Sequence, residues 1–496
     1  MAIRIYNTMT RKKEELLPRE EGKISMYVCG PTVYNLIHIG NARTFLNFDI
    51  IRRYMEHRGL EVTFVQNITD VDDKIINKAN EEGVEPAALA EEYRRAFEKD
   101  MAALGVKPPD EAPRATAHIQ EMLEVISRLL DGGYAYESGG DVYFEVEKFP
   151  GYGSLSGRNL EEQQHGMACS DAGLKRGPWD FALWKAAKPG EPSWDSPWGP
   201  GRPGWHIECS TMSMKYLGEG FDIHGGGLDL VFPHHENEIA QAEASSGKPF
   251  VRYWIHSGML NVDMEKMSKS LGNIKTLRQV LEEHDAATVR MLMLGTHYRS
   301  PLNFSDESLR DAAASLERIT NCAFNLEDLI ARAGDWGGGL VRTEEQTRIV
   351  HRLNDLQAEF LSHMDDDFNT AAALGVLFEV VREINSHSRH ALDMKTPCAK
   401  VVLLECQRVL EEMCEAVGLV LPVAGGAAAP GEPGAVAPGE PGPTRDELVE
   451  LLLGVRQAAR ESKSFALADR IRDGLAELGV KVEDVPGGFR WRFERR

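Results

Sequence analysis

Four residues of metal-binding types are the first candidates for chemistry, although they lie far apart in the chain. His234 and Glu238 follow Pro233, a residue typical of the first turn of a helix. Their spacing puts both side chains on one helical face, about 6 Å apart, which suits two ligands of one zinc ion. Cys29 and Cys209 are the cysteines that could complete a site for zinc, an ion of borderline softness. Buried, inert thiols and a solvated helix face are the alternative interpretations.

A second group of residues is suited to phosphate. The segment His38-Ile-Gly-Asn41 follows an apolar run and precedes a helical pattern. Gly40 lets a ligand approach the backbone, the amides at a helix start bind anions, and His38 can donate a hydrogen bond to a phosphate oxygen. Far downstream, the segment from Lys266 to Ser270 offers two lysines and two hydroxyls to a phosphate chain whose charge grows in a transition state. For segments this short, a turn with a solvent-facing histidine and a solvated surface loop are the alternatives.

The elements that must position these residues begin with a strand–helix–strand unit. Residues 24–30 and 62–68 are short apolar runs that predict strands, and the apolar residues from Phe45 to Met55 follow helical spacing. Strand, helix and strand within that length predict a parallel sheet. Because sites in such sheets lie at the carboxyl ends of the strands, we expect the loop from Cys29 to Asn41 to belong to the site.

The composition divides the rest of the chain into several parts. We expect an α/β domain over residues 1–305, with an insertion at about 108–203 where Gly, Pro and Trp are frequent. Residues 423–443 are rich in Ala, Gly and Pro and are expected to form a linker, followed by a small α+β module at 444–496. A helical bundle over 306–422 is predicted by two apolar stripes, Leu309, Ala313, Leu316 and Ala323 in the first and Ile349, Leu353, Leu356 and Phe360 in the second.

Charge and cysteine content limit the partners and the compartment. The 496 residues contain 56 Lys and Arg against 77 Asp and Glu, and the net charge of −21 excludes indiscriminate nucleic-acid binding. The first 23 residues lack the apolar stretch of a signal peptide, and no segment is long and apolar enough to predict a membrane span. The seven cysteines are odd in number and irregularly spaced, which argues against a disulfide framework. We therefore expect a cytoplasmic protein.

The C-terminal module differs in charge from the rest of the chain. Residues 445–496 carry 11 Lys and Arg against 10 Asp and Glu, a net charge near +1. At its end, residues 489–496 interleave arginine with aromatic side chains, as in proteins that contact single-stranded RNA. A terminal strand that packs its aromatic side chains inward is the alternative.

The two phosphate-binding segments occur in the arrangement typical of class I aminoacyl-tRNA synthetases, and the chain resembles that class. The flanking sequences are similar to the cysteinyl-tRNA synthetase family over nearly the whole chain. The resemblance implies a class I catalytic domain of Rossmann type at 1–305. The part of this domain from about 260 to 305 would carry the second phosphate-binding segment and contact the tRNA stem. The resemblance also implies an anticodon-recognition module at 444–496. The segments that carry it are 67–73, 180–185, 193–199, 201–210, 221–229, 232–238, 365–370 and 468–473.

The resemblance also implies roles for individual residues. Asn41 departs from the commoner histidine at the end of the first signature, and because asparagine carries no charge, an ionic role there is in doubt. The implied zinc ligands are Cys29, Cys209, His234 and Glu238. The implied ATP-binding residues are His38, Gly40, Asn41, Lys266, Ser268, Lys269 and Ser270, among which His38, Lys266 and Lys269 are catalytic. The residues implied around the amino acid are Thr69, Trp205, His224 and Asp229.

The implied reaction has two steps. The carboxylate of L-cysteine attacks the α-phosphate of ATP to give cysteinyl-adenylate and pyrophosphate. A terminal ribose hydroxyl of tRNA(Cys) then takes the cysteinyl group and AMP is released. The resemblance further implies one zinc ion per chain, magnesium bound with ATP and a monomer. A cysteine ligase of mycothiol synthesis would not need the C-terminal module, and a tRNA-binding paralogue without charging activity would be expected to lack signature lysines or metal ligands. The module, the lysines and the ligands are all present in this sequence.

Overall fold

The computed structural model divides the chain into two compact units, Met1–Leu421 and Pro422–Arg496. In the first unit it describes residues 2–158, 173–262, 265–266, 275–333, 342–390 and 399–421. In the second it describes residues 449–450, 452–453, 456–457, 460, 465–477, 479–485 and 488–493. The expected linker at 423–443 lies outside the described residues.

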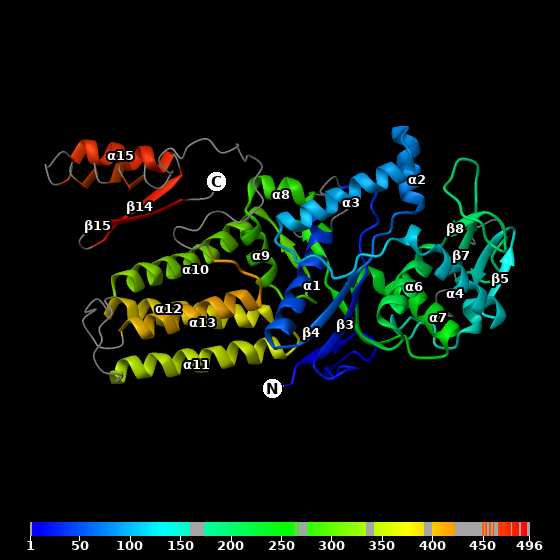
Figure 1. Ribbon diagram of the computed structural model, residues 1–496, viewed down its shortest axis with the longest axis horizontal. Helices are drawn as coiled ribbons and strands as arrows, with labels where there is room; N and C mark the ends of the chain where they lie inside the picture. The colour runs from blue at the N-terminus through cyan, green and yellow to red at the C-terminus, as the bar shows by residue number, and fades with distance from the viewer. Residues whose placement is uncertain are drawn as a thin grey trace. The chain divides into compact units, whose positions relative to one another are not determined.

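A four-stranded parallel sheet forms the centre of the first unit, in the order β10-β9-β3-β4 (Figure 1). Its strands are β3 (Lys23–Val28), β4 (Glu61–Gln66), β9 (Phe221–Gly227) and β10 (Val251–Ser257). The helix α1 (Ile39–His57) connects β3 to β4, and its apolar residues, such as Leu46 and Ile50, are buried in the core. Parallel sheets covered on both faces have continuous apolar strands, and β9 is buried at every position. The predicted parallel sheet is therefore confirmed.

The chain between β4 and β9 builds a second layer. An antiparallel four-stranded sheet, β5-β6-β7-β8, follows three helices, and α6 then returns the chain to the parallel sheet. Phe144 and Trp184 of this antiparallel sheet share one apolar core with Cys29 and Cys209. The elements are α2 (Asp73–Glu82), α3 (Pro86–Ala103), α4 (Ile119–Asp131), β5 (Ala135–Ser138), β6 (Asp141–Phe144), β7 (Phe181–Ala186), β8 (Gly201–Pro203) and α6 (Trp205–Leu217).

Shorter elements complete the first unit around the parallel sheet. The first two strands form an antiparallel hairpin, and β11 pairs with both β12 and β13 in a small three-stranded sheet. The remaining elements are β1 (Arg4–Asn7), β2 (Lys12–Glu15), α7 (Glu236–Ser246), β11 (Leu260–Val262), β12 (Glu265–Lys266), α8 (Leu277–Glu283), α9 (Ala286–Leu294) and β13 (Leu302–Phe304).

Four helices form the predicted bundle: α10 (Asp306–Arg332), α11 (Glu344–Asp365), α12 (Thr370–His390) and α13 (Ala399–Ala416). Figure 1 shows them side by side. The second stripe is confirmed, because Ile349, Leu353, Leu356 and Phe360 are all buried. The first stripe is wrong at one position. Ala313 is exposed, and the buried residues of α10 are Leu309, Ala312, Ile319, Cys322 and Leu326.

The second unit contains α15 (Phe465–Glu477) and an antiparallel hairpin of β14 (Val480–Val485) and β15 (Gly488–Phe493). The expected α+β module is thus confirmed. Phe489 and Trp491 pack against a small core that includes Leu453 and Leu475. Side chains alternate between the two faces of a strand. The alternation of arginine with aromatic residues in β15 is therefore explained by one face of the strand packing against this core.

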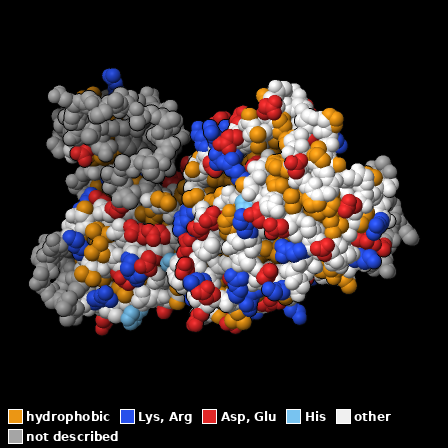
Figure 2. All heavy atoms as spheres, turned by 45° about the vertical axis from the view of Figure 1, so that its right-hand side comes forward, with side chains coloured by type: hydrophobic (Ala, Val, Ile, Leu, Met, Phe, Trp, Pro, Cys, Tyr) orange, Lys and Arg blue, Asp and Glu red, His pale blue; other side chains and the backbone are white. Residues whose placement is uncertain are grey.

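The visible surface of the molecule carries charges of both signs (Figure 2). Lysine and arginine side chains lie among aspartate and glutamate side chains over the described residues of this face. Within the described part of the chain, no helix is long and apolar enough to cross a membrane.

Three consecutive aspartates attach the bundle to the parallel-sheet region. Asp365 accepts a hydrogen bond from the hydroxyl of Tyr54 on α1 at 2.6 Å, and Asp366 pairs with Lys13 of β2 at 2.8 Å. Asp367 is fully buried. It accepts hydrogen bonds from the backbone amide of Tyr6 at 2.8 Å, from the Tyr298 hydroxyl at 2.7 Å and from Arg299 Nε at 2.8 Å. The carboxylate of Asp366 is half-buried, whereas that of Asp367 is fully buried and joins the bundle to the segments of Tyr6 and Tyr298.

This difference predicts unequal effects of two neighbouring substitutions. Asp367→Ala should lower the free energy of unfolding by about 3–5 kcal/mol, because it leaves buried donors without their shared acceptor. Asp366→Ala is the matched control and should cost at most about 1 kcal/mol, since it removes a partly exposed ion pair. Urea denaturation of both variants measures the difference, and similar losses would contradict the assignment.

Candidate active site

The four predicted metal ligands meet in one buried cluster. Cys29 directly follows β3, and Cys209 lies on α6. His234 lies on a short π-helical turn, η4 (Val231–His235), and Glu238 lies in the first turn of α7. Their ligand atoms all lie within 4.8 Å of one another, and all four residues are buried. The structure therefore brings together donors from four segments of the chain.

The spacing of the donor atoms fits one tetrahedral ion. The two sulfur atoms are 3.7 Å apart, and two sulfurs held at about 2.3 Å by a tetrahedral zinc ion would lie about 3.8 Å apart. A disulfide needs a sulfur–sulfur distance of only about 2.05 Å, and both cysteines are free thiols. The distance from Cys29 Sγ to Glu238 Oε1 is 3.4 Å, and that from His234 Nε2 to Glu238 Oε1 is 3.0 Å. The donor set can therefore hold a metal ion of borderline softness.

Burial and mutual charge strongly shift the pKa values of these groups. Burial raises the pKa of the Cys29 thiol well above its ordinary value, and the neighbouring Cys209 raises it further. Burial also acts to raise the pKa of Cys209, but hydrogen bonds with Cys29 and His234 outweigh it and lower that pKa to about 6. Burial opposes ionisation of His234 as well, yet the charge of Glu238 raises the pKa of the imidazole to about 10. Without a metal ion, protons must therefore balance the anionic donors, and a bound cation replaces them.

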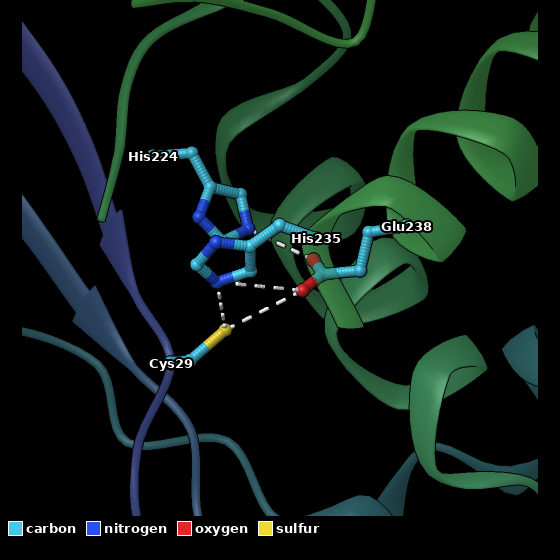
Figure 3. A group of neighbouring side chains, drawn as sticks. All are labelled: Cys29, His224, His235 and Glu238. Atoms are coloured by element: carbon cyan, nitrogen blue, oxygen red, sulfur yellow. Dashed lines mark hydrogen bonds and ion pairs between the residues drawn. The ribbon is translucent and has the colours of Figure 1, made fainter. Parts of the chain in front are cut away.

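Two further histidines reach the same cluster from outside the predicted four. Figure 3 shows His224 and His235 pointing toward Glu238 and Cys29. His224 Nε2 is 2.8 Å from Glu238 Oε2, and His235 Nε2 is 3.4 Å from Cys29 Sγ. With Cys29 and Glu238 they form a second, overlapping group whose ligand atoms also lie within 4.8 Å of one another.

The hydrogen-bond partners of His235 indicate that it supports Cys29, one of the candidate metal ligands. Its Nδ1 is 2.8 Å from His256 Nε2, and His256 Nδ1 is 2.8 Å from the Thr8 hydroxyl. Burial lowers the pKa of both imidazoles, that of His256 to about 3, so both are neutral near pH 7. If Cys29 is a thiolate, the hydrogen bonds all point in one direction, from the Thr8 hydroxyl through both rings to the sulfur. This direction is fixed because each neutral ring donates only one hydrogen bond. Sequence analysis missed His235, although the doubled histidine next to Pro233 was a signal.

The residues expected around the amino acid occupy two places. Trp205 stacks on His234 with ring centroids 4.2 Å apart. Thr69 is buried and donates to Glu208 Oε2 at 2.8 Å, next to Cys209. Together with His224, described above, these residues surround the candidate metal cluster. Asp229 is exposed instead, and it acts electrostatically on His38.

The first phosphate-binding segment lies at the amino end of α1. His38 is the residue that caps this helix, and its Nδ1 accepts a hydrogen bond from the backbone amide of Asn41 at 3.1 Å. Burial lowers the pKa of His38, so the ring is neutral near pH 7 and its proton resides on Nε2. Gly40 lies in the first turn of the helix, and Asn41 is exposed. His38 can therefore donate to an anion from Nε2, while the Asn41 backbone amide holds the ring.

The second phosphate-binding segment is only partly described. Lys266 belongs to β12, where its backbone pairs with Asn261 of β11. The side chain of Lys266 and the whole of Ser268, Lys269 and Ser270 lie outside the described residues.

The contact between His235 and Cys29 predicts weaker metal binding when it is removed. His235→Asn should lower zinc affinity by about 10- to 100-fold, the usual effect of losing a group that holds a metal ligand. His118→Asn is the matched control and should leave zinc affinity unchanged, because His118 is also buried but bonds to Arg114 and Tyr216. Competition with a chromophoric chelator measures both affinities. Equal affinities for His235→Asn and the unsubstituted protein would show that this contact does not support the metal.

Comparison with solved structures defines the class of fold. The chain is similar to methionyl-tRNA synthetase of Mycobacterium tuberculosis in complex with methionyl-adenylate, with a TM-score of 0.60, 17% sequence identity, and coverage of 80% of this chain and 89% of that chain. It is also similar to LeuRS of Agrobacterium radiobacter, solved in a ternary complex, with a TM-score of 0.59, 12% identity, and coverage of 81% and 85%. At these identities the likeness concerns the fold, which is that of a class I tRNA synthetase.

Comparison of sequences defines the family more narrowly. Residues 15–314 match the class I (C) tRNA synthetase catalytic domain, residues 359–421 match the DALR domain, and residues 443–492 match the cysteinyl-tRNA ligase anticodon binding domain. The cysteine–tRNA ligase of Heliobacterium modesticaldum is 49% identical over 99% of this chain and 100% of its own length. That of Pelotomaculum thermopropionicum is 50% identical over 99% of each chain. The chain belongs to the cysteine–tRNA ligase family.

Proposed function

We propose that this protein activates L-cysteine with ATP and transfers the cysteinyl group to the 3′ end of tRNA(Cys). The observation that carries the proposal is the buried group of two thiols, an imidazole and a carboxylate beside the carboxyl end of β3. Membership of the cysteine–tRNA ligase family supports the same reaction. Class I sites of this kind need no protein nucleophile, since positioning and charge stabilisation supply the catalysis.

Zinc is the metal that the donor set fits best. Cys29, Cys209, His234 and Glu238 would hold it, because thiolate, imidazole and carboxylate are all zinc ligands. When bound, the ion supplies a centre that prefers a thiolate to a neutral hydroxyl, which separates cysteine from serine more sharply than cavity size does. His224 and His235 orient the ligands Glu238 and Cys29 through the contacts described above.

Other side chains act on the reacting groups. We assign to His38 a hydrogen bond from Nε2 to a phosphate oxygen of ATP, next to the helix-terminal amides at Gly40 and Asn41. Lys266 and Lys269 are proposed to balance the charge that grows on the phosphates, with Ser268 and Ser270 as further donors. Magnesium is expected to enter with ATP and to be held largely by its phosphates.

The amino acid itself is proposed to lie between the metal cluster and the first phosphate-binding segment. Trp205 and Thr69 border the cluster, and His224 holds a carboxylate ligand. Asp229, which acts electrostatically on His38, is suited to a substrate ammonium group because it is an exposed acidic side chain. We therefore propose that the thiol end of the substrate faces the cluster and that its carboxylate faces ATP.

Partner and compartment follow from the same proposal. We propose a monomer that acts in the cytoplasm. All five cysteines that the structure describes are buried and free, as expected in a reducing compartment.

The direct test is cysteine-dependent exchange between ATP and pyrophosphate, followed by charging of total tRNA and a zinc determination on the same preparation. We expect exchange with cysteine and none with serine, a cysteinylated tRNA product, and about one zinc ion per chain. Folded, zinc-loaded protein without cysteine-dependent exchange would contradict the activity. A cysteine ester or amide formed only on glucosaminyl-inositol would assign the chain to a different ligation.

The C-terminal unit provides a second prediction. We propose that residues 444–496 bind the anticodon region of tRNA(Cys), because residues 443–492 match an anticodon binding domain. Deletion of 444–496 should lower kcat/KM for tRNA charging by at least about 100-fold, the usual loss when one of two linked binding sites is removed. Cysteine-dependent exchange should be nearly unchanged, since the first unit is compact by itself. Equal losses in charging and exchange would contradict this assignment.

A further inference from the structure

A buried arginine on α1 binds two backbone segments that are distant in sequence. Arg43 has 1% of its surface exposed. Its Nη1 donates to the carbonyl oxygens of Gly258 at 2.9 Å and Met259 at 2.6 Å. Its Nη2 donates to the carbonyl oxygen of Ser300 at 2.5 Å and lies 3.5 Å from that of His297. The planar guanidinium therefore joins segment 258–259 to segment 297–300.

The setting of Arg43 differs from that of other buried arginines in the protein. Arg52 and Arg290 are paired with carboxylates, Asp110 and Asp49 respectively. No carboxylate among the described residues pairs with Arg43, so its burial is compensated only by carbonyl oxygens. Burial lowers its pKa to about 10, which still leaves it cationic near pH 7. Its buried Nε has no hydrogen-bond partner among the described residues. The carbonyl contacts of Nη1 and Nη2 are therefore what offsets the cost of burying this charge.

Each of the two segments leads directly into a strand of the small three-stranded sheet. Segment 258–259 precedes β11, and segment 297–300 precedes β13, which pairs with β11. On its other side, β11 pairs with β12, whose last residue is Lys266. Arg43 is therefore attached through β11 to the strand that carries the first residue of the second phosphate-binding segment.

A second contact fixes the chain on the far side of that segment. The amide of Ile39 donates to the carbonyl oxygen of Lys275 at 3.1 Å, and the amide of Leu277 donates to that of Ile37 at 3.0 Å. His38 and Thr276 form a bridge between the same stretches. The residues just after positions 267–274 are thus bound to the start of α1 and to the residues just before it. Those just before these positions are connected to α1 only indirectly, through β11 and Arg43.

We propose that Arg43 is a positioning residue that sets the strand of Lys266 relative to His38, so that both reach the phosphates of one ATP molecule. Arg43 does not touch substrate in this role. It acts through backbone carbonyls, and it helps to fix the distance between the strand of Lys266 and His38. The inference rests on the proposed cysteine activation, because it assigns those parts to ATP.

The first test compares two arginine-to-lysine variants on the same helix. The single ammonium of lysine cannot span both segments as the guanidinium fork does, so Arg43→Lys should lower kcat of cysteine-dependent ATP–pyrophosphate exchange by about 10- to 100-fold. Its KM for cysteine and its zinc content should remain those of the unsubstituted enzyme, because the metal cluster makes no contact with Arg43. Arg52→Lys is the control, and its kcat should stay within about twofold.

A second variant disturbs the same contact from the opposite side. A Cβ atom on Gly258 would lie 2.5 Å from the carbonyl oxygen of Arg299 and 2.6 Å from that of Ser300, so Gly258→Ala must push the two segments apart. It should lower kcat in the same way and again spare the KM for cysteine. Gly375→Ala, where a Cβ meets nothing within 4 Å, is its control. If Arg43→Lys does not fold, Gly258→Ala decides the question.

The outcomes separate this inference from the proposed function. Exchange by the unsubstituted enzyme tests the function alone, before any variant is made. An unchanged kcat in Arg43→Lys or, if that variant does not fold, in Gly258→Ala would overturn the positioning role. Parallel losses of kcat, zinc content and affinity for cysteine would also overturn it, because they would show a general structural defect.

Discussion

The burial of ionisable donors in one small volume is the constraint on which the rest of this structure depends. Cys29, Cys209, His234 and Glu238 are each at most 5% exposed, and removing such groups from water costs several kcal/mol per charge unless they are paired. Burial alone would raise the pKa of Glu238, yet the charges of His224 and His234 lower it to about 2. The carboxylate is therefore ionised and balanced by its neighbours. A cluster of this kind is stable only with protons or a metal ion shared among its members.

The surrounding architecture fixes the positions of those donors relative to one another. The parallel sheet supplies Cys29 at the end of β3 and His224 within β9, while the antiparallel layer shares its apolar core with both cysteines. The same strand–helix connection places His38 at the amino end of α1, so one member of the candidate metal cluster and the proposed phosphate site both follow β3. Arg43 then ties α1 to the segments that precede the small three-stranded sheet, and Asp365 at the end of α11 ties α1 to the bundle. Chemistry and scaffold thus share one helix.

Sequence reasoning predicted the parts of this design that depend on local pattern. The run before Cys29 and the helical spacing from Phe45 to Met55 are set by burial along a strand and a helix, and both elements form as expected. The same reasoning misplaced Ala313, because an alanine contributes too little apolar area to show which side of a helix faces the core. Whether Lys269 contacts ATP stays a prediction, since it lies outside the described residues.

Other features of the site could not be read from pattern, because they depend on contacts between distant segments. The series of hydrogen bonds from Thr8 through His256 to His235 joins residues from three separate segments. Arg43 binds backbone carbonyls, which are present at every residue and leave no mark in a sequence. Residue type and spacing named the metal ligands only as candidates, and the resemblance to a family implied the full set. Their spacing alone left a solvated helix face and buried, inert thiols as alternatives.

We propose that the cluster, with its metal ion bound, recognises the substrate through the thiolate. Cobalt can replace zinc in such sites and absorbs near-ultraviolet light through each bound sulfur, so the absorption reports the number of thiolates. Adding L-cysteine to the cobalt-substituted protein should raise this absorption by about half, as a third thiolate joins two, whereas L-serine should leave it unchanged. No change with cysteine, or the same change with serine, would contradict the claim.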